Sequence, residues 1–374
     1  MIETIGYVSE ANPFKDRKAW SGLRYKIREA IENAGFSVVW IPYRVNKYWV
    51  LILRALFLIR YGRHFEYTRH PWYLWYCAKS VDKDLVEKCD ALFFPGMAQL
   101  TAFLNTDKPF FYYTDATYHG LVTYYGTQIN KYSYKFGNLY EKFAIDNCKL
   151  MIHASNWSAD MAENFYGCNH EKNKVLQFGA NIDDTDIVEC VVYEKGELNI
   201  LFSGVDWYRK GAPQAIEAVG ELRKRGYNAK LHICGIKCPP QNYLPFPDYV
   251  INHGFLNKND ALQYQEYINI IKKSHIFLLP TKAECAGIVF SEASAYGLPI
   301  FTYNTGGIGD YVKDGVNGYK LPLGSPGENF ANIIDRCIKR NELKHLSEGG
   351  IELFKTDLSW NAWSEKFKSM LVDV

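Results

Sequence analysis

The stretch TKAECAGIVFSEASAYGLPIF, residues 281–301, decides how the second half of the chain is interpreted. It follows a short apolar run, Ile276 to Leu279, that ends at Pro280, and a helical pattern resumes near Gly287. Residues 281–286 are therefore expected to form a loop at the carboxyl end of a strand, where open α/β sheets bind ligands. The following helix offers free N–H groups and the positive end of its dipole, which favours a phosphate.

Two carboxylates flank this expected anion site, Glu284 in the loop and Glu292 inside the helix. A carboxylate repels a phosphate, so both side chains should instead accept hydrogen bonds from hydroxyl groups on either side of it. A molecule with hydroxyls at both ends of a diphosphate is a nucleotide sugar. Two such Glu residues also occur by chance near helix starts, because Glu stabilises the dipole there. The expected phosphate-binding backbone comprises Ala286, Gly287, Ile288 and Val289.

Short apolar runs alternate with stretches of helical period, first over one half of the chain and again over the other. This alternation predicts two doubly wound α/β domains, 1–185 and 186–355, separated by the polar stretch before Gly196. A representative helix, Leu23 to Ala34, is followed by Gly35 as its stop. The predicted strands are Ile5–Val8, Val38–Ile41, Ala91–Phe94, Phe110–Tyr113, Met151–His153, Val175–Phe178, Ile200–Phe202, Leu231–Cys234, Tyr249–Ile251, Ile276–Leu279 and Ile300–Tyr303.

The composition is that of a globular protein, with 374 residues, 48% of them hydrophobic and 22% charged. A net charge of +2 provides no global basic field, so nucleic acid is not an expected partner. The nine scattered cysteines lack the spacing of a zinc or redox site and are expected to be buried thiols in a reducing compartment. The first residues carry no secretory pattern. A cytoplasmic protein is therefore expected.

The segment ECAGIVFSEASAYGLP, residues 284–299, resembles the donor-site signature of GT-B glycosyltransferases of the retaining family 4, in which two Glu residues enclose seven others. Cys-Ala stands where Gly-Phe is common. Downstream, NTGGIGD and DGVNG resemble the family's GG-x-x-E and DG-x-NG, with Asp310 in the place of the usual Glu. The resemblance covers nearly the whole chain and is most specific in the second half.

LFSGVDWYRKGAPQAIEA, residues 201–218, resembles the family's strand, glycine turn and Lys-Gly before a helix. Gly204 is the turn glycine, and Arg209 and Lys210 are implied to neutralise the diphosphate. Cations at a helix start oppose its dipole, which favours an anionic ligand over two solvated charges. Some relatives carry an Arg where Val205 stands, so which cation meets which phosphate stays open.

NPFKDRKAWSGLRYKIREAI, residues 12–31, resembles the family's N-terminal loop, where Ser21 and Gly22 would let backbone approach the donor phosphate or the acceptor. Ser21 is equally suited to be an ordinary helix N-cap. Many members contact the transferred sugar with a side chain from this half. Asp115, at a predicted strand end, is the expected residue here, and His119 is the alternative.

The resemblance implies two Rossmann-like, doubly wound parallel-sheet domains facing across a cleft, with a final helix in 356–374 packing back on the first. It implies metal-independent transfer of a sugar from a nucleotide sugar with retention of anomeric configuration, for polysaccharide or glycoconjugate biosynthesis. No cofactor is expected, and two Asp-x-Asp triplets lie outside the donor segment. A nucleotide-sugar epimerase and a non-catalytic binding module are the alternatives. The implied catalytic residues are Glu284, Asp115, Arg209 and Lys210.

Residues 44–76 combine a Val, Leu, Ile and Phe run with six Lys and Arg residues against the single Glu66. The run is too short and too charged to span a bilayer, which needs about 20 apolar residues. It is suited either to lie at a membrane surface or to form a buried helix whose arginines extend to solvent. In both cases the segment is expected to border the acceptor site. The expected acceptor is a glycan or lipid-linked glycan at the inner face of the membrane.

Overall fold

The computed structural model describes residues 2–17, 19–44, 46–188 and 192–372. The chain divides into two compact units, unit 1 (Met1–Gln177 and Trp363–Val374) and unit 2 (Phe178–Ala362). The boundary predicted between residues 185 and 186 falls inside unit 2. Of the C-terminal segment 356–374, the part from Trp363 onward belongs to unit 1.

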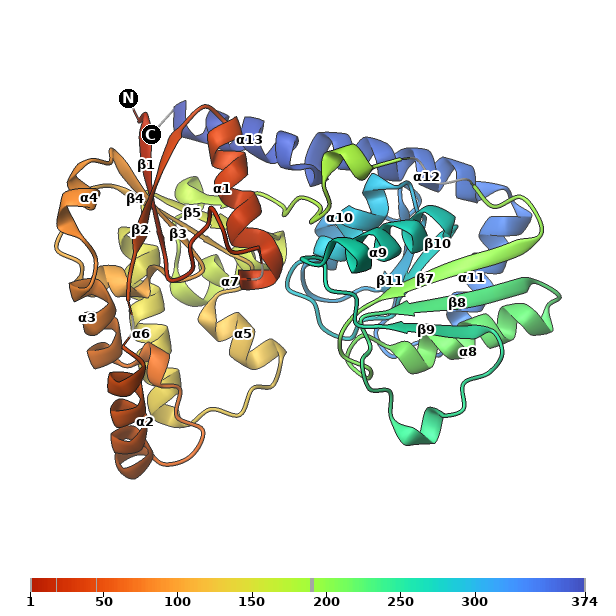
Figure 1. Ribbon diagram of the computed structural model, residues 1–374, viewed down its shortest axis with the longest axis horizontal. Helices are drawn as coiled ribbons and strands as arrows, with labels where there is room; N and C mark the ends of the chain where they lie inside the picture. Colours follow the sequence, from red (N-terminus) through yellow and green to blue (C-terminus); the bar gives the residue numbers. More distant parts are fainter. Residues whose placement is uncertain (1, 18, 45, 189–191, 373–374) are drawn as a thin grey trace. The chain divides into compact units, whose positions relative to one another are not determined.

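Unit 1 contains a six-stranded sheet of order β2-β1-β3-β4-β5-β6, in which every described pairing is parallel. Helices flank the sheet (Figure 1). The elements are β1 (Thr4–Ser9), η1 (Ala19–Gly22), α1 (Leu23–Asn33), β2 (Ser37–Pro42), α2 (Lys47–Tyr61), η2 (Tyr67–Arg69), α3 (Pro71–Lys79), α4 (Lys83–Glu87), β3 (Ala91–Pro95), η3 (Ala98–Phe103), β4 (Phe110–Thr114), α5 (Tyr118–Tyr124), α6 (Lys131–Asn147), β5 (Leu150–His153), α7 (Asn156–Tyr166), η4 (His170–Lys172) and β6 (Asn173–Val175).

Unit 2 contains a second six-stranded parallel sheet, of order β12-β11-β10-β7-β8-β9. The two α/β sheets confirm the predicted fold class. The elements are η5 (Asp184–Asp186), β7 (Glu197–Ser203), α8 (Ala212–Lys224), β8 (Asn228–Cys234), η6 (Gln241–Tyr243), β9 (Val250–Gly254), α9 (Ala261–Lys273), β10 (Ile276–Leu279), α10 (Ile288–Ala295), β11 (Ile300–Tyr303), η7 (Gly306–Asp310), β12 (Gly318–Leu321), α11 (Gly327–Lys339), α12 (Glu342–Leu353), η8 (Phe354–Leu358) and α13 (Trp360–Val372).

One predicted strand was wrong in part, and one observed strand was not predicted. The run predicted as Val175–Phe178 is a strand only at its first residue, because β6 ends at Val175. Leu176 and Phe178 are buried side chains of the segment that follows. The edge strand β12 was not predicted, since its sequence GYKL lacks an apolar run.

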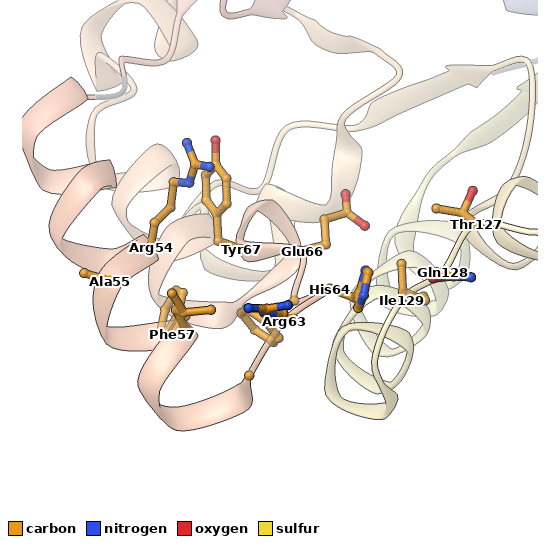
Figure 2. Close-up of a pocket in the computed structure, with 13 residues that line it drawn as sticks. Arg54, Ala55, Phe57, Arg63, His64, Glu66, Tyr67, Thr127, Gln128 and Ile129 are labelled. Atoms are coloured by element: carbon orange, nitrogen blue, oxygen red, sulfur yellow. The ribbon is translucent and has the colours of Figure 1, made fainter.

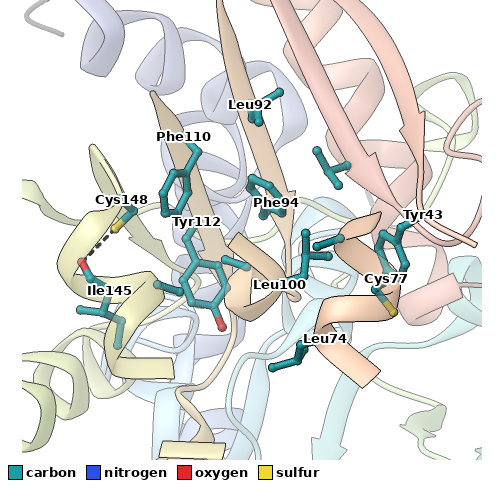
Figure 3. Close-up of a cluster of buried hydrophobic side chains, with 14 of the residues drawn as sticks. Tyr43, Leu74, Cys77, Leu92, Phe94, Leu100, Phe110, Tyr112, Ile145 and Cys148 are labelled. Carbon is teal, nitrogen blue, oxygen red and sulfur yellow. Dashed lines mark hydrogen bonds between the residues drawn. The ribbon is translucent and has the colours of Figure 1, made fainter. Parts of the chain in front are cut away.

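The core of unit 1 is built from aromatic and aliphatic side chains of the sheet and the helices on one of its faces (Figure 3). Phe94 and Phe110 from neighbouring strands meet edge to face with ring centroids 5.6 Å apart. Such packing removes large apolar areas from water and fixes the strands that carry the loops. The thiols of Cys77 and Cys148 belong to this core, as predicted for the cysteines, but the prediction was wrong for Cys238, which is exposed.

Helix α13 starts in unit 2 and continues in unit 1. In unit 2, Trp360 Nε1 donates to the carbonyl of Ala180 (2.8 Å). In unit 1, Ser364 Oγ donates to the carbonyl of Ala30 (2.8 Å) in α1. The first two turns of the helix are thus held by hydrogen bonds to backbone carbonyls of both units.

Candidate functional site

The strand order of unit 2 creates a topological switch point between β7 and β10. The chain proceeds from β7 to β8 and β9 on one side, and from β10 to β11 and β12 on the other. The loops that follow β7 and β10 therefore meet at the carboxyl edge of the sheet, where ligands bind in open α/β folds. The amide of Lys282 donates to the carbonyl of Arg209 (2.7 Å), which joins the two loops.

Gly211 permits this close approach of the two loops. Its φ is +80°, and a Cβ there would lie 2.1 Å from the carbonyl oxygen of Pro280. Gly204 has a related role, because a Cβ on it would lie 2.8 Å from Cγ of Lys210. The two glycines of the first loop thus make room for the second loop and for the lysine side chain.

Lys210 and Glu284 form an ion pair across these loops. Nη1 of Arg209 lies 3.8 Å from the same Glu284 carboxylate and donates to the carbonyl of Ala283 (2.9 Å). Lys210 is only 7% exposed, so its charge is held within the site. An ammonium has three N–H donors, so the carboxylate of Glu284 leaves Lys210 able to bind a second anionic group.

This pairing gives both cations partners within the protein. Arg209 and Lys210 were expected to oppose the dipole of the helix they precede, which made an anion the favoured explanation. Helix α8 begins at Ala212, and the two cations are directed to Glu284 and Asp206 instead. Their position before α8 therefore does not by itself indicate an anionic ligand. Their shared contact with Glu284 indicates a binding site instead, because it concentrates charged groups at the switch point.

Glu292 is buried, with 2% of its surface exposed, and is held by two residues that the sequence did not single out. Tyr267 Oη donates to its Oε2 (2.9 Å), and Lys258 Nζ forms an ion pair with its Oε1. Burial, together with the charge of Glu292, raises the pKa of Tyr267 well above its usual value, so its hydroxyl stays a donor. The only signal in the sequence was general: a buried carboxylate needs hydrogen-bonding partners.

The N-terminus of α10 lies between the two carboxylates. The helix begins at Ile288 with Gly287 as N-cap and without a side-chain cap. Within its first turn Phe290 N donates to the carbonyl of Gly287 (2.8 Å), so the N–H groups of Ile288 and Val289 are the ones that the helix itself does not use. Ser291 Oγ fixes this turn by donating to the carbonyl of Phe178 (2.9 Å). Ala286 and Val289 flank Gly287 and Ile288, so the structure groups the expected phosphate-binding backbone with Glu284 and Glu292.

The downstream motifs support this turn rather than adding chemistry to it. Gly307 N donates to the carbonyl of Glu284 (3.0 Å), which fixes the loop before α10. Asn317 Nδ2 donates to Ser294 Oγ (3.1 Å) on α10 and to the carbonyl of Tyr311 (2.9 Å). Asp310, the residue in the place of the usual Glu, is buried at the end of η7.

The predicted site residues of the first half all lie in unit 1. Gly22 is the N-cap of α1 in the left-handed conformation, with φ +84°. The N-cap prediction for Ser21 was wrong, because the N-cap of α1 is Gly22 and Ser21 adopts φ +56° within η1. Asp115 directly follows β4 and is half-buried.

His119 is held by aromatic neighbours of unit 1. Its ring stacks on Phe165 with centroids 3.6 Å apart, and its Nδ1 lies 2.7 Å from Tyr134 Oη. Burial lowers the pKa of His119, so the neutral ring is favoured. These contacts give His119 a structural role in the packing of α5, α6 and α7.

Known proteins resemble this chain in sequence and in fold. Residues 186–351 match the family model of glycosyl transferases group 1. An uncharacterized glycosyltransferase of Methanocaldococcus jannaschii is 25% identical over 229 residues, 60% of this chain and 59% of that protein. The capsular polysaccharide biosynthesis glycosyltransferase CapM of Staphylococcus aureus is 25% identical over 170 residues, 43% of each chain. The matches thus span less than two thirds of the lengths of these relatives.

The solved structure of Anabaena HepE in complex with UDP is similar over the whole chain. It has a TM-score of 0.66 at 16% identity and covers 100% of both chains, which is a likeness of fold. The two Rossmann-like units are those of a GT-B protein. Residues 186–351, which match the family model of glycosyl transferases group 1, contain every donor-site residue from Gly204 to Glu292.

Proposed function

We propose that the protein is a retaining glycosyltransferase that moves a sugar from a nucleotide sugar to a glycan or lipid-linked glycan acceptor. The observation that carries the proposal is the convergence of Lys210, Glu284, the first turn of α10 and Glu292 at the switch point of unit 2. The group 1 match supports transfer, and the names of HepE with UDP and CapM support a nucleotide donor and a cell-surface polysaccharide context.

In the proposed donor complex, the diphosphate lies between the two cations and the first amides of α10. Arg209 and Lys210 supply positive charge, and the helix terminus supplies N–H donors. Glu292 accepts hydrogen bonds from the ribose, and Glu284 accepts them from the transferred sugar. Because Lys210 already binds Glu284, one ammonium would fix the sugar-binding carboxylate and the phosphate together.

The proposed reaction breaks the bond between the anomeric carbon and the diphosphate oxygen. The acceptor hydroxyl oxygen forms the new bond on the same face of the sugar, and its proton passes to the departing diphosphate. Unit 2 would stabilise the leaving charge through Arg209, Lys210 and α10, without a metal or another cofactor. Unit 1 would bind the acceptor, with Gly22 at the donor phosphate or acceptor and Asp115 at the transferred sugar.

A panel of nucleotide sugars tests the proposal in two stages. Thermal shift identifies the donor, since a ligand of the folded state raises the apparent melting temperature. The protein is then incubated with that donor and with a glycolipid extract as the acceptor, with and without a chelator, and the products are analysed. Acceptor-dependent transfer with a retained anomeric configuration is expected in both conditions. Conversion of the free donor without an acceptor would indicate an epimerase, and binding without turnover a binding module.

A further inference from the structure

Helix α2 exposes an apolar face that no described part of the chain covers. It buries Leu53 and Phe57 against unit 1, while Ile59 is 85% exposed. No described helix of the protein is long and apolar enough to cross a bilayer. The other large exposed apolar side chains of α2 are Tyr48, Trp49, Leu51, Ile52, Leu56 and Leu58.

The arrangement around the helix axis is ordered. At about 100° per residue, the seven large exposed apolar side chains fall within an arc of about 180°, centred roughly opposite the buried Leu53 and Phe57. Lys47 and Arg54 border this arc on one side, and Arg60 borders it on the other. Helix α2 contains no acidic residue. Apolar side chains flanked by cations, on a helix attached to a folded domain by its opposite face, are typical of helices at a membrane interface.

A cavity of about 580 Å³ lies at the C-terminal end of α2, within unit 1 (Figure 2). Arg54, Arg63 and His64 line it together with a single carboxylate, Glu66. Figure 2 shows Arg54, which lies on α2, beside Tyr67. The guanidinium carbon of Arg54 lies 5.6 Å from the centroid of the Tyr67 ring. Among the described residues, no carboxylate lies within ion-pair distance of Arg54 or Arg63.

The carboxylate in the cavity is already engaged. Glu66 accepts hydrogen bonds from Thr68 Oγ1 (2.9 Å) and Tyr118 Oη (3.0 Å) and lies 3.7 Å from Arg69. Its charge is thus offset within the protein, whereas those of Arg54 and Arg63 are not. The cavity is therefore a net cationic one.

The opposite wall of the cavity is fixed in position. Asn130 N donates to the carbonyl of His64 (3.1 Å), and Asn130 Nδ2 donates to the carbonyl of Tyr61 (3.0 Å). These bonds hold the end of α2 against the segment 127–129 that closes the cavity. A formed cationic cavity beside an apolar helix face matches the two parts of an anionic phospholipid, its phosphate and its acyl chains.

We propose that α2 and this cavity form a docking site for anionic phospholipid in a bilayer surface. The apolar face of α2 lies at the boundary of headgroups and acyl chains, and Arg54, Arg63 and His64 receive a lipid phosphate. The site goes beyond the transfer reaction, because it requires neither donor nor catalysis. For a lipid-linked acceptor it would hold the enzyme at the surface that carries its substrate.

Vesicle co-sedimentation of the full chain tests the proposal with phosphatidylcholine vesicles, alone or mixed with phosphatidylglycerol. We expect binding to the mixed vesicles. The double substitution I52S and I59S should lower the partition coefficient between vesicles and water about tenfold or more, because it removes two apolar side chains from the contact with the bilayer. Arg63→Gln should lower it about fivefold on mixed vesicles only, the effect of one cation near an anionic surface.

Two exposed residues of unit 2 provide matched controls, Leu262→Ser and Arg340→Gln, which should leave partitioning unchanged. Absence of wild-type binding to mixed vesicles, or equal losses in the controls, would overturn the proposal. Sedimentation of the free protein as a dimer that I52S and I59S dissociate would assign the face to a second copy instead. The donor-induced thermal shift is measured on the same samples, so failure of the proposed transferase function remains distinguishable from failure of docking.

Discussion

Lys210 and Glu284, 74 residues apart in the sequence, form an ion pair between the loops that follow two adjacent strands of unit 2. The pair exists because the strand order reverses between β7 and β10, which brings a basic loop and an acidic loop to the same edge of the sheet. A carboxylate held by a nearly buried ammonium is oriented before any substrate arrives. The central claim is that this pair and Glu292 bind the two ends of one donor molecule.

Glu284→Gln should mainly slow transfer. The amide keeps the shape of the side chain but removes the charge that orients Lys210, so stabilisation of the departing diphosphate is lost. We expect kcat to fall about 100-fold or more, with a much smaller change in the KM for the donor. Steady-state kinetics of the purified variant gives both constants. An unchanged kcat would remove Glu284 from the chemistry.

Glu292→Ala should weaken donor binding. Loss of a charged hydrogen-bond acceptor for the ribose costs about 1.5–3 kcal/mol, which corresponds to roughly a 10- to 100-fold rise in Kd. Calorimetric titration of the nucleoside diphosphate measures it. Tyr267→Phe removes a hydrogen bond to Glu292 but keeps the carboxylate, so its effect should be smaller. Equal affinity of the wild type and the Glu292→Ala variant would contradict the assignment of the ribose site.

Gly211→Ala should destabilise unit 2 and reduce donor binding together. The left-handed conformation costs a residue with a Cβ about 1–2 kcal/mol, and the approach to Pro280 adds an overpacking cost of about 1–3 kcal/mol. Urea unfolding measures the loss. Gly309→Ala is the matched control, since a Cβ there meets nothing within 4 Å. Similar free energies of unfolding for both variants would refute the close approach of the loops.

Much of the fold could be predicted because buried parallel strands are short apolar runs, and β10 illustrates this with IFLL. The donor motif was equally visible, because Glu284, Gly287 and Glu292 lie close together in the chain. Lys258 and Tyr267 were missed since they reach Glu292 from 34 and 25 residues away, through the packing of α9 and the loop before it. Ser21 was misjudged because composition does not reveal a left-handed backbone.

Buried His153 should make unit 1 less stable in acid. Burial lowers the pKa of His153 to about 3, so below pH 6.5 the unfolded chain binds a proton that the folded state does not. The free energy of unfolding therefore falls between pH 6.5 and about 3, by about 2 kcal/mol at pH ~5 from this residue alone.

Urea unfolding at pH ~7.5 and ~5 measures this contribution. In His153→Gln the loss of stability between the two pH values should be smaller by about 2 kcal/mol. The exposed His345→Gln should behave as the wild type. Parallel losses in wild type and the His153→Gln variant would show that His153 does not cause the acid sensitivity.

A crystal structure of the complex with the nucleoside diphosphate identified by thermal shift would show where the donor binds. We expect the diphosphate to lie within hydrogen-bonding distance of the Ile288 and Val289 amides and of Lys210, with the ribose hydroxyls on Glu292. A nucleotide bound elsewhere in unit 2, or one whose ribose does not reach Glu292, would contradict this expectation.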